Sequence, residues 1–221
     1  TQVAFTGAQA ALGYPNSSVE ISELGNPAIL GTAVNGSVSL QFQGPVSGLQ
    51  RLVGDALGVW TRGNIQTWDL VNAAQRTVSA QSGAIPYTVC DMGQPMFADF
   101  RGIGSISAVL GYGDFQRGKY SQLINPVLID RLQSDQQTQD ADRRALASYS
   151  VRNKNQYRLI FRDGYQITGT FINDGLPQFT WQRFYVDDSE DSDKQIQFLA
   201  TCYGTTSGGK DLQFFSIANQ P

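Results

Sequence analysis

Three aspartates in this 221-residue chain could, by type and position, take part in hydrolysis. Asp99, Asp114 and Asp163 fall within or beside predicted strands, and cleavage of a glycoside needs two carboxylates about 5 to 10 Å apart. Asp163 equally suits the tight turn that it forms with Gly164. The chain has no histidine, which excludes catalytic triads and histidine acid–base chemistry. We therefore expect no enzymatic activity and no catalytic residue.

A run of acidic residues is the best candidate for a metal site. Carboxylate oxygens at alternating positions can bind calcium. The candidate ligands, in a run that also contains Glu190, are Asp187, Asp188, Asp191 and Asp193. The glycine and glutamate positions of an EF-hand loop are absent, and such a run is typical of a solvated loop. We expect no metal and no cofactor.

A glycine-rich segment near the C-terminus resembles a phosphate-binding loop. Residues Gly204 to Lys210 match its first seven positions, but the eighth is Asp211 where Ser or Thr should bind magnesium. A strand pattern follows where a helix should begin. The glycine pair therefore indicates a hairpin turn.

Tryptophans and a basic cluster complete the candidates. Exposed aromatic residues on a sheet can stack on sugars, and the tryptophans concerned are Trp60, Trp68 and Trp181. Packing between neighbouring sheets is the other interpretation.

Basic residues that share the parity of one strand face are suited to ion pairs or subunit contacts, and they are Arg152, Lys154, Arg158 and Arg162.

The composition narrows the classes of partner. Sixteen basic and nineteen acidic residues give a net charge of −3, unlike the basic stripe of a nucleic-acid binder. No apolar stretch is long enough for a membrane span.

Cys90 and Cys202 lie in strand patterns, and we interpret both as buried and reduced, with a bridge between them as the alternative. The first residue is Thr1, so the chain is either processed or part of a longer protein.

The element that must position these residues is a recurring hairpin. Four times an apolar strand enters a turn at a glycine and leaves as a second strand, at Gly63, Gly102, Gly164 and Gly209. The glycines are 39, 62 and 45 residues apart, and a four-stranded propeller blade takes about 40 to 50 residues. The pattern predicts an all-β protein of repeated antiparallel hairpins, β-propeller-like, with a short helical insertion in the middle interval.

Two regions flank this pattern. Residues 1–47 are predicted to form an N-terminal arm and a first hairpin around Asn35-Gly36. Residues 48–221 are the propeller-like body, and its insertion spans about residues 116–147. Pro126 suits the first turn of a helix there. Because the insertion is polar, we expect it to project from the body and to contact another subunit.

Several segments resemble structural proteins of tailed bacteriophages, of the propeller-like kind in the tail nozzle of short-tailed phages. The resemblance covers about residues 48 to 172, and its segments are Gly54–Ile65, Phe97–Ile103, Tyr112–Phe115, Ser121 and Arg152–Gly164. It implies a virion protein that is assembled in the bacterial cytoplasm. It also implies a homo-oligomeric ring, six-fold, below the portal and adaptor. Such a ring continues the DNA channel and helps to retain and release the genome, without binding DNA specifically.

Two functions therefore compete. The first is a structural ring of a phage tail, which requires surfaces for assembly. The alternative is a carbohydrate- or receptor-binding β module of a virion, which requires exposed aromatic residues beside a pocket.

Overall fold

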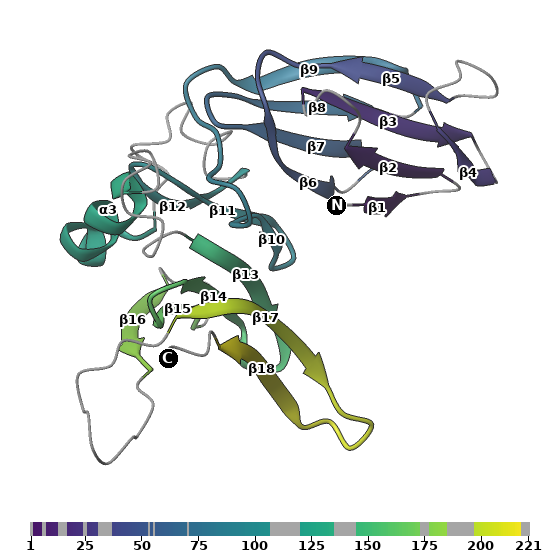
Figure 1. Ribbon diagram of the computed structural model, residues 1–221. Helices are drawn as coiled ribbons and strands as arrows, with labels where there is room; N and C mark the ends of the chain where they lie inside the picture. Colours follow the sequence, from purple (N-terminus) through teal and green to yellow (C-terminus); the bar gives the residue numbers. More distant parts are fainter. Residues whose placement is uncertain are drawn as a thin grey trace.

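The computed structural model describes the greater part of the chain (Figure 1). The described residues are 2–5, 8–12, 17–23, 26–30, 37–52, 54, 56–69, 71–106, 120–134, 145–172, 177–184 and 197–217. Within these residues, no helix has the length and apolar character needed to cross a membrane.

The described strands pair antiparallel and form sheets that follow one another along the chain. Sheet 1 contains β1 (Gln2–Phe5), β2 (Ala8–Leu12), β3 (Ser18–Glu23), β4 (Asn26–Leu30) and β5 (Val38–Gln41). Sheet 2 contains β6 (Val46–Leu52), β7 (Ala56–Thr61), β8 (Ile65–Asp69) and β9 (Ala74–Ser79). Sheet 3 contains β10 (Cys90–Asp91), β11 (Pro95–Asp99) and β12 (Gly102–Ser105). Sheet 4 contains β13 (Ala145–Val151), β14 (Gln156–Phe161), β15 (Tyr165–Thr170) and β16 (Gln178–Arg183). Sheet 5 contains β17 (Phe198–Thr205) and β18 (Asp211–Ile217).

The all-β class is confirmed, and so are the four recurring hairpins. They are β7–β8, β11–β12, β14–β15 and β17–β18. Gly102, Gly164 and Gly209 have positive φ angles of 141°, 82° and 76°. Gly63 has no positive φ, so its turn does not need a glycine.

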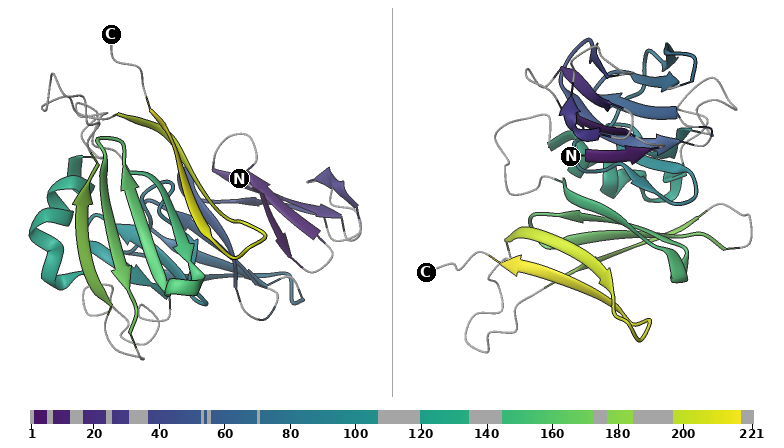
Figure 2. Two further views of the ribbon diagram at one scale, coloured as in Figure 1. Left: turned by 90° about the horizontal axis from the view of Figure 1, so that it is seen from below. Right: turned by 90° about the vertical axis from the view of Figure 1, so that its right-hand side faces the viewer.

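Neighbouring sheets pack face to face, because the central strand of each inner sheet is apolar on both sides (Figure 2). In β7, Leu57 and Val59 pack between sheets 1 and 2, whereas Trp60 turns to the core between sheets 2 and 3. The same division recurs in β11 and β14. Side chains alternate across a strand, so one continuous apolar run can supply two cores.

The central strand of sheet 4 makes this division plain. Tyr157, Leu159 and Phe161 join the core shared with sheet 3, and Ile160 joins the core shared with sheet 5. The hydroxyl of Tyr157 is buried and donates to the carbonyl of Thr88, 3.0 Å away, which ties sheet 4 to the segment before β10. The interface between these sheets is therefore both apolar and specifically hydrogen-bonded.

The predicted helix exists, but the expectation that it projects from the body is wrong. The helix α3 (Asn125–Ser134) follows the 3₁₀ turn η1 (Gln122–Ile124), and its Leu128 and Leu132 are fully buried in the core of sheets 3 and 4. The Arg131 guanidinium donates to the Asp163 carboxylate at 2.6 Å. Polar composition misled because α3 buries Leu128, Leu132 and the paired Arg131 on one face, while the polar residues of its other face stay exposed. Residues 107–119 and 135–144 of the insertion lie outside the described residues.

The segment predicted as an N-terminal arm contains strands of sheet 1. Strands β1 and β2 pair within sheet 1, and Val19 and Ile21 of β3 are fully buried against sheet 2. The strand β5 pairs with β3, whereas the sequence predicts that it pairs across the Asn35-Gly36 turn. Residues 31–36, Gly36 included, lie outside the described residues. Small residues in β1 and β2 gave little hydrophobic alternation, so the pattern could not reveal this sheet.

The burial of α3 can be tested with two leucines of different exposure. Leu132→Ala should destabilise the protein by about 2 to 5 kcal/mol, because it leaves a cavity in a closed core. Leu123→Ala is the control, since this side chain of η1 is 96% exposed and its loss should change little. Urea unfolding measures both. Equal effects of the two variants would show that α3 does not belong to the core.

The turn glycines give a second test. Gly164→Ala and Gly209→Ala should each cost about 1 kcal/mol or more, because alanine is strained at positive φ. Gly63→Ala should be neutral or slightly stabilising, since an added Cβ meets nothing within 4 Å and φ is ordinary. Thermal unfolding of the three variants would contradict the turn geometry if Gly63→Ala were the most damaging.

Candidate functional site

The first strands of sheets 2 to 5 border one groove. Strand β10 lies beside β13, and β13 lies beside β17. The groove has a volume of about 440 Å³, and its lining is polar with one charged residue, Asp91. The described lining residues are Gln50, Val89, Cys90, Asp91, Ala147, Ser148, Tyr149, Ser150, Thr201, Cys202 and Tyr203.

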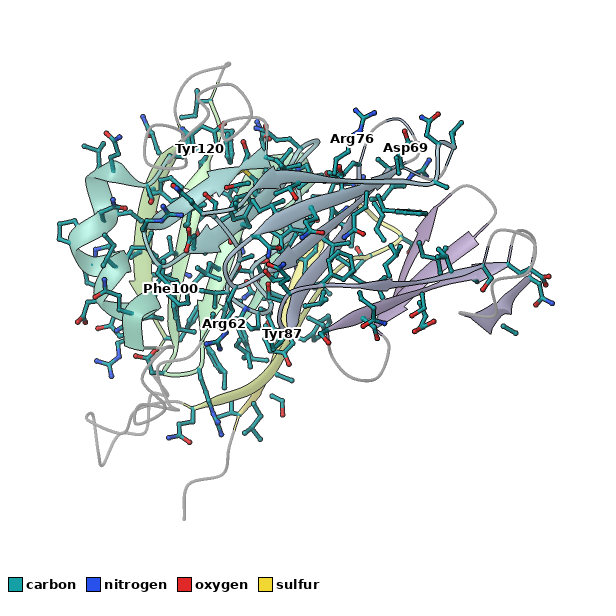
Figure 3. The ribbon with its side chains drawn as sticks, turned by 90° about the horizontal axis from the view of Figure 1, so that it is seen from above. Arg62, Asp69, Arg76, Tyr87, Phe100 and Tyr120 are labelled. Carbon is teal, nitrogen blue, oxygen red and sulfur yellow. The ribbon has the colours of Figure 1, made fainter. Side chains whose placement is uncertain are left out.

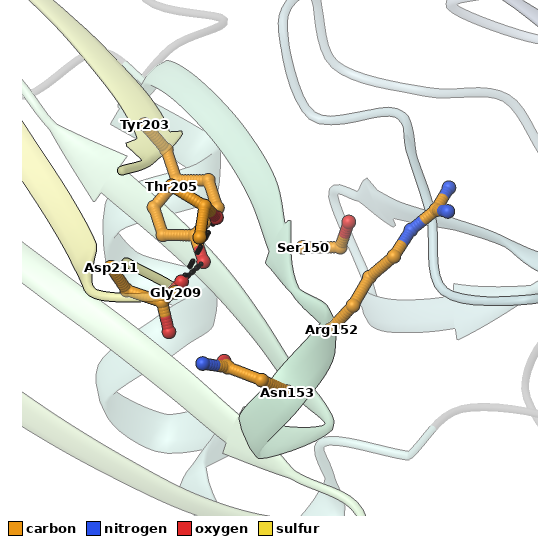
Figure 4. Close-up of a pocket in the computed structure, with 7 residues that line it drawn as sticks. All are labelled: Ser150, Arg152, Asn153, Tyr203, Thr205, Gly209 and Asp211. Carbon is orange, nitrogen blue, oxygen red and sulfur yellow. Dashed lines mark hydrogen bonds between the residues drawn. The ribbon is translucent and has the colours of Figure 1, made fainter. Parts of the chain in front are cut away.

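A pocket of about 410 Å³ adjoins this groove and shares Ser150 and Tyr203 with it (Figure 4). One wall comes from the end of β13 and the 3₁₀ turn η3 (Arg152–Lys154). The opposite wall comes from the β17–β18 hairpin. The described lining residues are Ser150, Arg152, Asn153, Tyr203, Thr205, Gly209 and Asp211. The pocket is thus formed where two successive sheets meet.

Asp211 is the central group of this pocket. Its Oδ1 accepts hydrogen bonds from the hydroxyl groups of Tyr203 and Thr205, the latter at 3.0 Å. The Tyr203 hydrogen bond is the main reason that the pKa of Asp211 is lowered, and Lys154 contributes by its charge. The carboxylate is therefore ionised at neutral pH. The Asn153 side chain also donates a hydrogen bond to this carboxylate and lowers its pKa further.

Neighbouring side chains fix the shape of the pocket. The Tyr203 ring stacks on Tyr149 of β13, with centroids 5.3 Å apart and planes 10° apart. The amide of Asn153 points toward Asp211, whereas Arg152 points away from it (Figure 4). Arg152 instead contacts the Asp91 carboxylate at 3.3 Å. The pocket therefore combines an ionised carboxylate, an amide, hydroxyl groups and one aromatic ring.

The candidate carboxylates of hydrolysis do not meet in this pocket. Asp99 pairs with Arg101 at 2.6 Å in the β11–β12 turn, and burial raises its pKa against the opposing effect of that arginine. Asp163 pairs with Arg131 and accepts from the Tyr165 amide in the β14–β15 turn. Each carboxylate thus has a role in its own hairpin. Asp114 lies outside the described residues.

The acidic run also lies outside the described residues, since it falls within 185–196. The calcium candidates therefore stay predictions, and they are Asp187, Asp188, Asp191 and Asp193. Among the residues that the structure describes, no three carboxylate or thiol side chains are grouped as a metal site would require.

The glycine-rich segment forms the predicted hairpin. Strand β17 ends at Thr205 and β18 begins at Asp211, so no helix follows the glycines. The Gly209 amide donates to the Thr206 carbonyl, and the Thr206 amide donates to the Lys210 carbonyl. This closed turn rules out the helix N-terminus on which a phosphate-binding loop depends.

The tryptophans have different environments. Trp60 is fully buried and Trp68 nearly so, which confirms packing between sheets for these two. Trp181 is 55% exposed and stacks on Tyr165 at 5.9 Å, and it is not among the described residues that line the pocket. The pocket's own aromatic residue, Tyr203, was not a sequence candidate, because nothing in its surroundings distinguishes it from a packed strand residue.

The basic cluster does not form one strand face. Arg152 and Lys154 lie in the η3 turn, which breaks the strand parity before Arg158 in β14. Arg158 donates to Gln213 of β18 at 3.1 Å and so links sheets 4 and 5. Arg152 and Arg158 therefore serve contacts between sheets.

A hairpin turn in sheet 2 gives a comparison for Asp211. Asp69 lies near Arg76 at the β8–β9 end of the sheet (Figure 3). The Asn72 side chain is the main reason that the pKa of Asp69 is lowered. Its Oδ1 accepts from the amides of Val71 and Asn72, so this carboxylate serves its own turn.

The comparisons with known proteins identify a likeness in fold. No protein-family model and no curated protein sequence matches the chain. The computationally designed protein Ika8 is similar over 97% of this chain, with a TM-score of 0.50 and 11% identity, and the chain spans 57% of its length. PorZ, an essential bacterial surface component of the type-IX secretion system of Porphyromonas gingivalis, is similar over 94% of this chain and 25% of its own, with a TM-score of 0.42 and 12% identity. The likeness to Ika8 concerns the fold alone, and that to PorZ is too low for any argument.

The cysteines require one correction. Both thiols are free, and Cys90 is buried as expected, but Cys202 is exposed on β17. Burial raises the pKa of Cys90 to about 12. Strand alternation located Cys202 in a sheet but could not show that its face of sheet 5 is uncovered.

The two thiols should therefore react differently. Iodoacetamide at pH 8 should label Cys202 alone in the native protein and both cysteines after unfolding, because the thiolate is the reactive form. Intact-mass measurement counts the labels, and Cys202→Ser should abolish native labelling. Rapid native labelling of Cys90, or an unlabelled mass lower by two hydrogens, would contradict this assignment.

Proposed function

We propose that this chain is a structural component of a phage tail, whose copies form a ring that continues the DNA channel and helps to retain and release the genome. Its sheets are propeller-like in this proposal, and the ring is six-fold, below the portal or adaptor. The proposal rests on the phage resemblance of the sequence together with one structural observation, an uncovered apolar face at the end of the stack of sheets.

That face belongs to sheet 5. Cross-strand partners share a face, and Thr201 with Phe215 and Tyr203 with Gln213 face sheet 4. Cys202 with Phe214 and Gly204 with Leu212 therefore occupy the opposite face. Phe214 is 55% exposed on this face, and Leu199 beside the β17 irregularity is 50% exposed. Exposed apolar groups gathered in this way are typical of an assembly surface.

The rest of the chain suits a conduit. Sheets packed face to face give a rigid wall, since protein interiors are close-packed. The net charge of −3 disfavours tight binding of DNA, which is a polyanion that must slide. A second copy of the chain is the occupant that we propose for the face of sheet 5.

Electron microscopy and mass photometry of the purified protein test this proposal. The native protein should form rings with a central channel. Phe214→Glu should shift the population to monomers, because a carboxylate on an apolar contact loses its hydration.

Val71→Glu is the matched control, since Val71 is 77% exposed in the turn after β8 and lies outside sheet 5. It should leave the rings intact. A native protein that is monomeric at every concentration tested, or rings that persist in Phe214→Glu, would overturn the proposal.

A further inference from the structure

The second strand of sheet 5 has an open edge. In sheets 2 and 4 the second strand pairs with a neighbour on each side, and these strands are β7 and β14. Among the described strands, β18 pairs with β17 alone. One row of its backbone groups therefore points toward the place that a further strand would occupy.

Two hydrogen bonds show which residues point to that edge. The Thr201 hydroxyl of β17 donates to the Phe214 carbonyl at 3.0 Å, so the backbone of Phe214 faces β17. The hydrogen bond that the Thr206 amide donates across the turn sets the same alternation. Because hydrogen-bonded and non-hydrogen-bonded pairs alternate in an antiparallel ladder, the backbone groups of Gln213 and Phe215 point away from β17. No backbone group of the described residues bonds to them there.

The outer edges of sheets 2, 3 and 4 are protected, whereas the edge of β18 is not. Strand β9 carries Arg76 and β16 carries Arg183, and charged side chains discourage pairing at an edge. The edge of β12 is covered, because the Ile103 amide donates to the Ser121 hydroxyl. By contrast, residues 212–217 of β18 contain no charge and no proline and include two adjacent phenylalanines. A segment of this composition readily accepts a further strand.

Sheet 4 extends past this edge and offers an uncharged surface. Strand β17 lies beside β13, so the open edge of β18 is directed toward β15 and β16. Gln166 of β15 contacts Gln213 of β18 at 3.0 Å, which identifies the side of sheet 4 that faces sheet 5. The β16 residues on that side are Gln178, Thr180 and Gln182, and all three are exposed. A strand added to β18 would therefore lie over polar, uncharged side chains.

The same hairpin of a second copy does not fit this place. Two-fold antiparallel pairing of β18 with its copy keeps the same face of both hairpins on one side. Sheet 4 of each copy would then lie on that side, and each sheet extends past β18 as far as β16. The two sheets would collide, whereas a single extended segment meets no such obstacle.

We propose that the open edge of β18 binds an extended segment of a different protein as a third strand of sheet 5. The segment pairs with the backbone of Gln213 and Phe215, as in other cases of β-strand addition. Its side chains alternate, with uncharged polar groups toward β16 and apolar groups on the outer side beside Phe214. The edge is distinct from the outer face of sheet 5, so this proposal does not rest on ring assembly.

Fluorescence polarisation with the purified full chain tests the edge. The probe is a labelled peptide in which threonine and valine alternate, with a lysine at each end. A displayed library of peptides with the same alternation of polar and apolar residues forms a second arm. We expect saturable binding, and hydrogen exchange should slow in residues 211–217 when the peptide is bound. The same peptide with N-methylated amides lacks the backbone donors and should not bind.

Gln213→Pro should weaken peptide binding by about tenfold or more, because proline removes the amide that points to the open edge. An edge strand tolerates proline where the amide has no partner in the sheet. Gln213→Ala is the matched control. It loses the same side-chain hydrogen bonds to Arg158 and Gln166 but keeps the amide, so it should bind as the native protein does.

The absence of binding in both arms would overturn the proposal. Equal binding by Gln213→Pro and Gln213→Ala, or by the N-methylated peptide, would overturn it as well. If Gln213→Pro does not fold, the N-methylated peptide still decides. Dimers that Gln213→Pro abolishes would assign the edge to a second copy instead. Phe214→Glu changes the outer face and tests the ring, so failure of one proposal is distinguishable from failure of the other.

Discussion

The fold depends on one constraint, which is that a sheet with apolar side chains on both faces needs a partner on each side. Strands β7, β11 and β14 all send alternate side chains into two different cores. Burial of a large apolar side chain contributes about 1.5 to 3 kcal/mol, so no inner sheet can leave a face in water without a large loss. The sheets must therefore stack, and the pocket lies where the end of β13 in sheet 4 meets the β17–β18 hairpin of sheet 5.

Much of the architecture could be predicted from local pattern. The glycines at 102, 164 and 209 predict hairpins because few turn types can join two strands so closely. Several of these turn types need a residue with positive φ, and glycine adopts it without strain. The strands between them have strong alternation or continuous apolar runs. The sequence pattern failed where the burial of a residue depends on residues far away in the chain. Leu128 and Leu132 look unremarkable in a polar segment, and only the opening between sheets 3 and 4 makes them core residues.

The candidate site was harder to predict than the fold. Asp211 attracted notice only as a mismatch to a phosphate-binding loop, and Ser150 and Asn153 carry no local signal. Their function as a group depends on the β17–β18 hairpin lying against the end of β13, which are separated by more than fifty residues in the chain. Conversely, Asp99 and Asp163 attracted notice as carboxylates, although each is bound by an arginine. Residue type can suggest chemistry, but proximity of non-local groups determines it.

The helix α3 has a consequence for the order in which the molecule gains and loses structure. Successive sheets contact mainly their neighbours in the chain, so the protein behaves as a short linear array whose stability is shared between adjacent units. The side chain of Ser121, just before η1 and α3, accepts from the Ile103 amide of β12, and Arg131 of α3 binds the β14–β15 turn. Together with the buried Leu128 and Leu132, these bonds join sheets 3 and 4 through α3. Opening should therefore spread inward from both ends of the array, with amide exchange slowest at its centre.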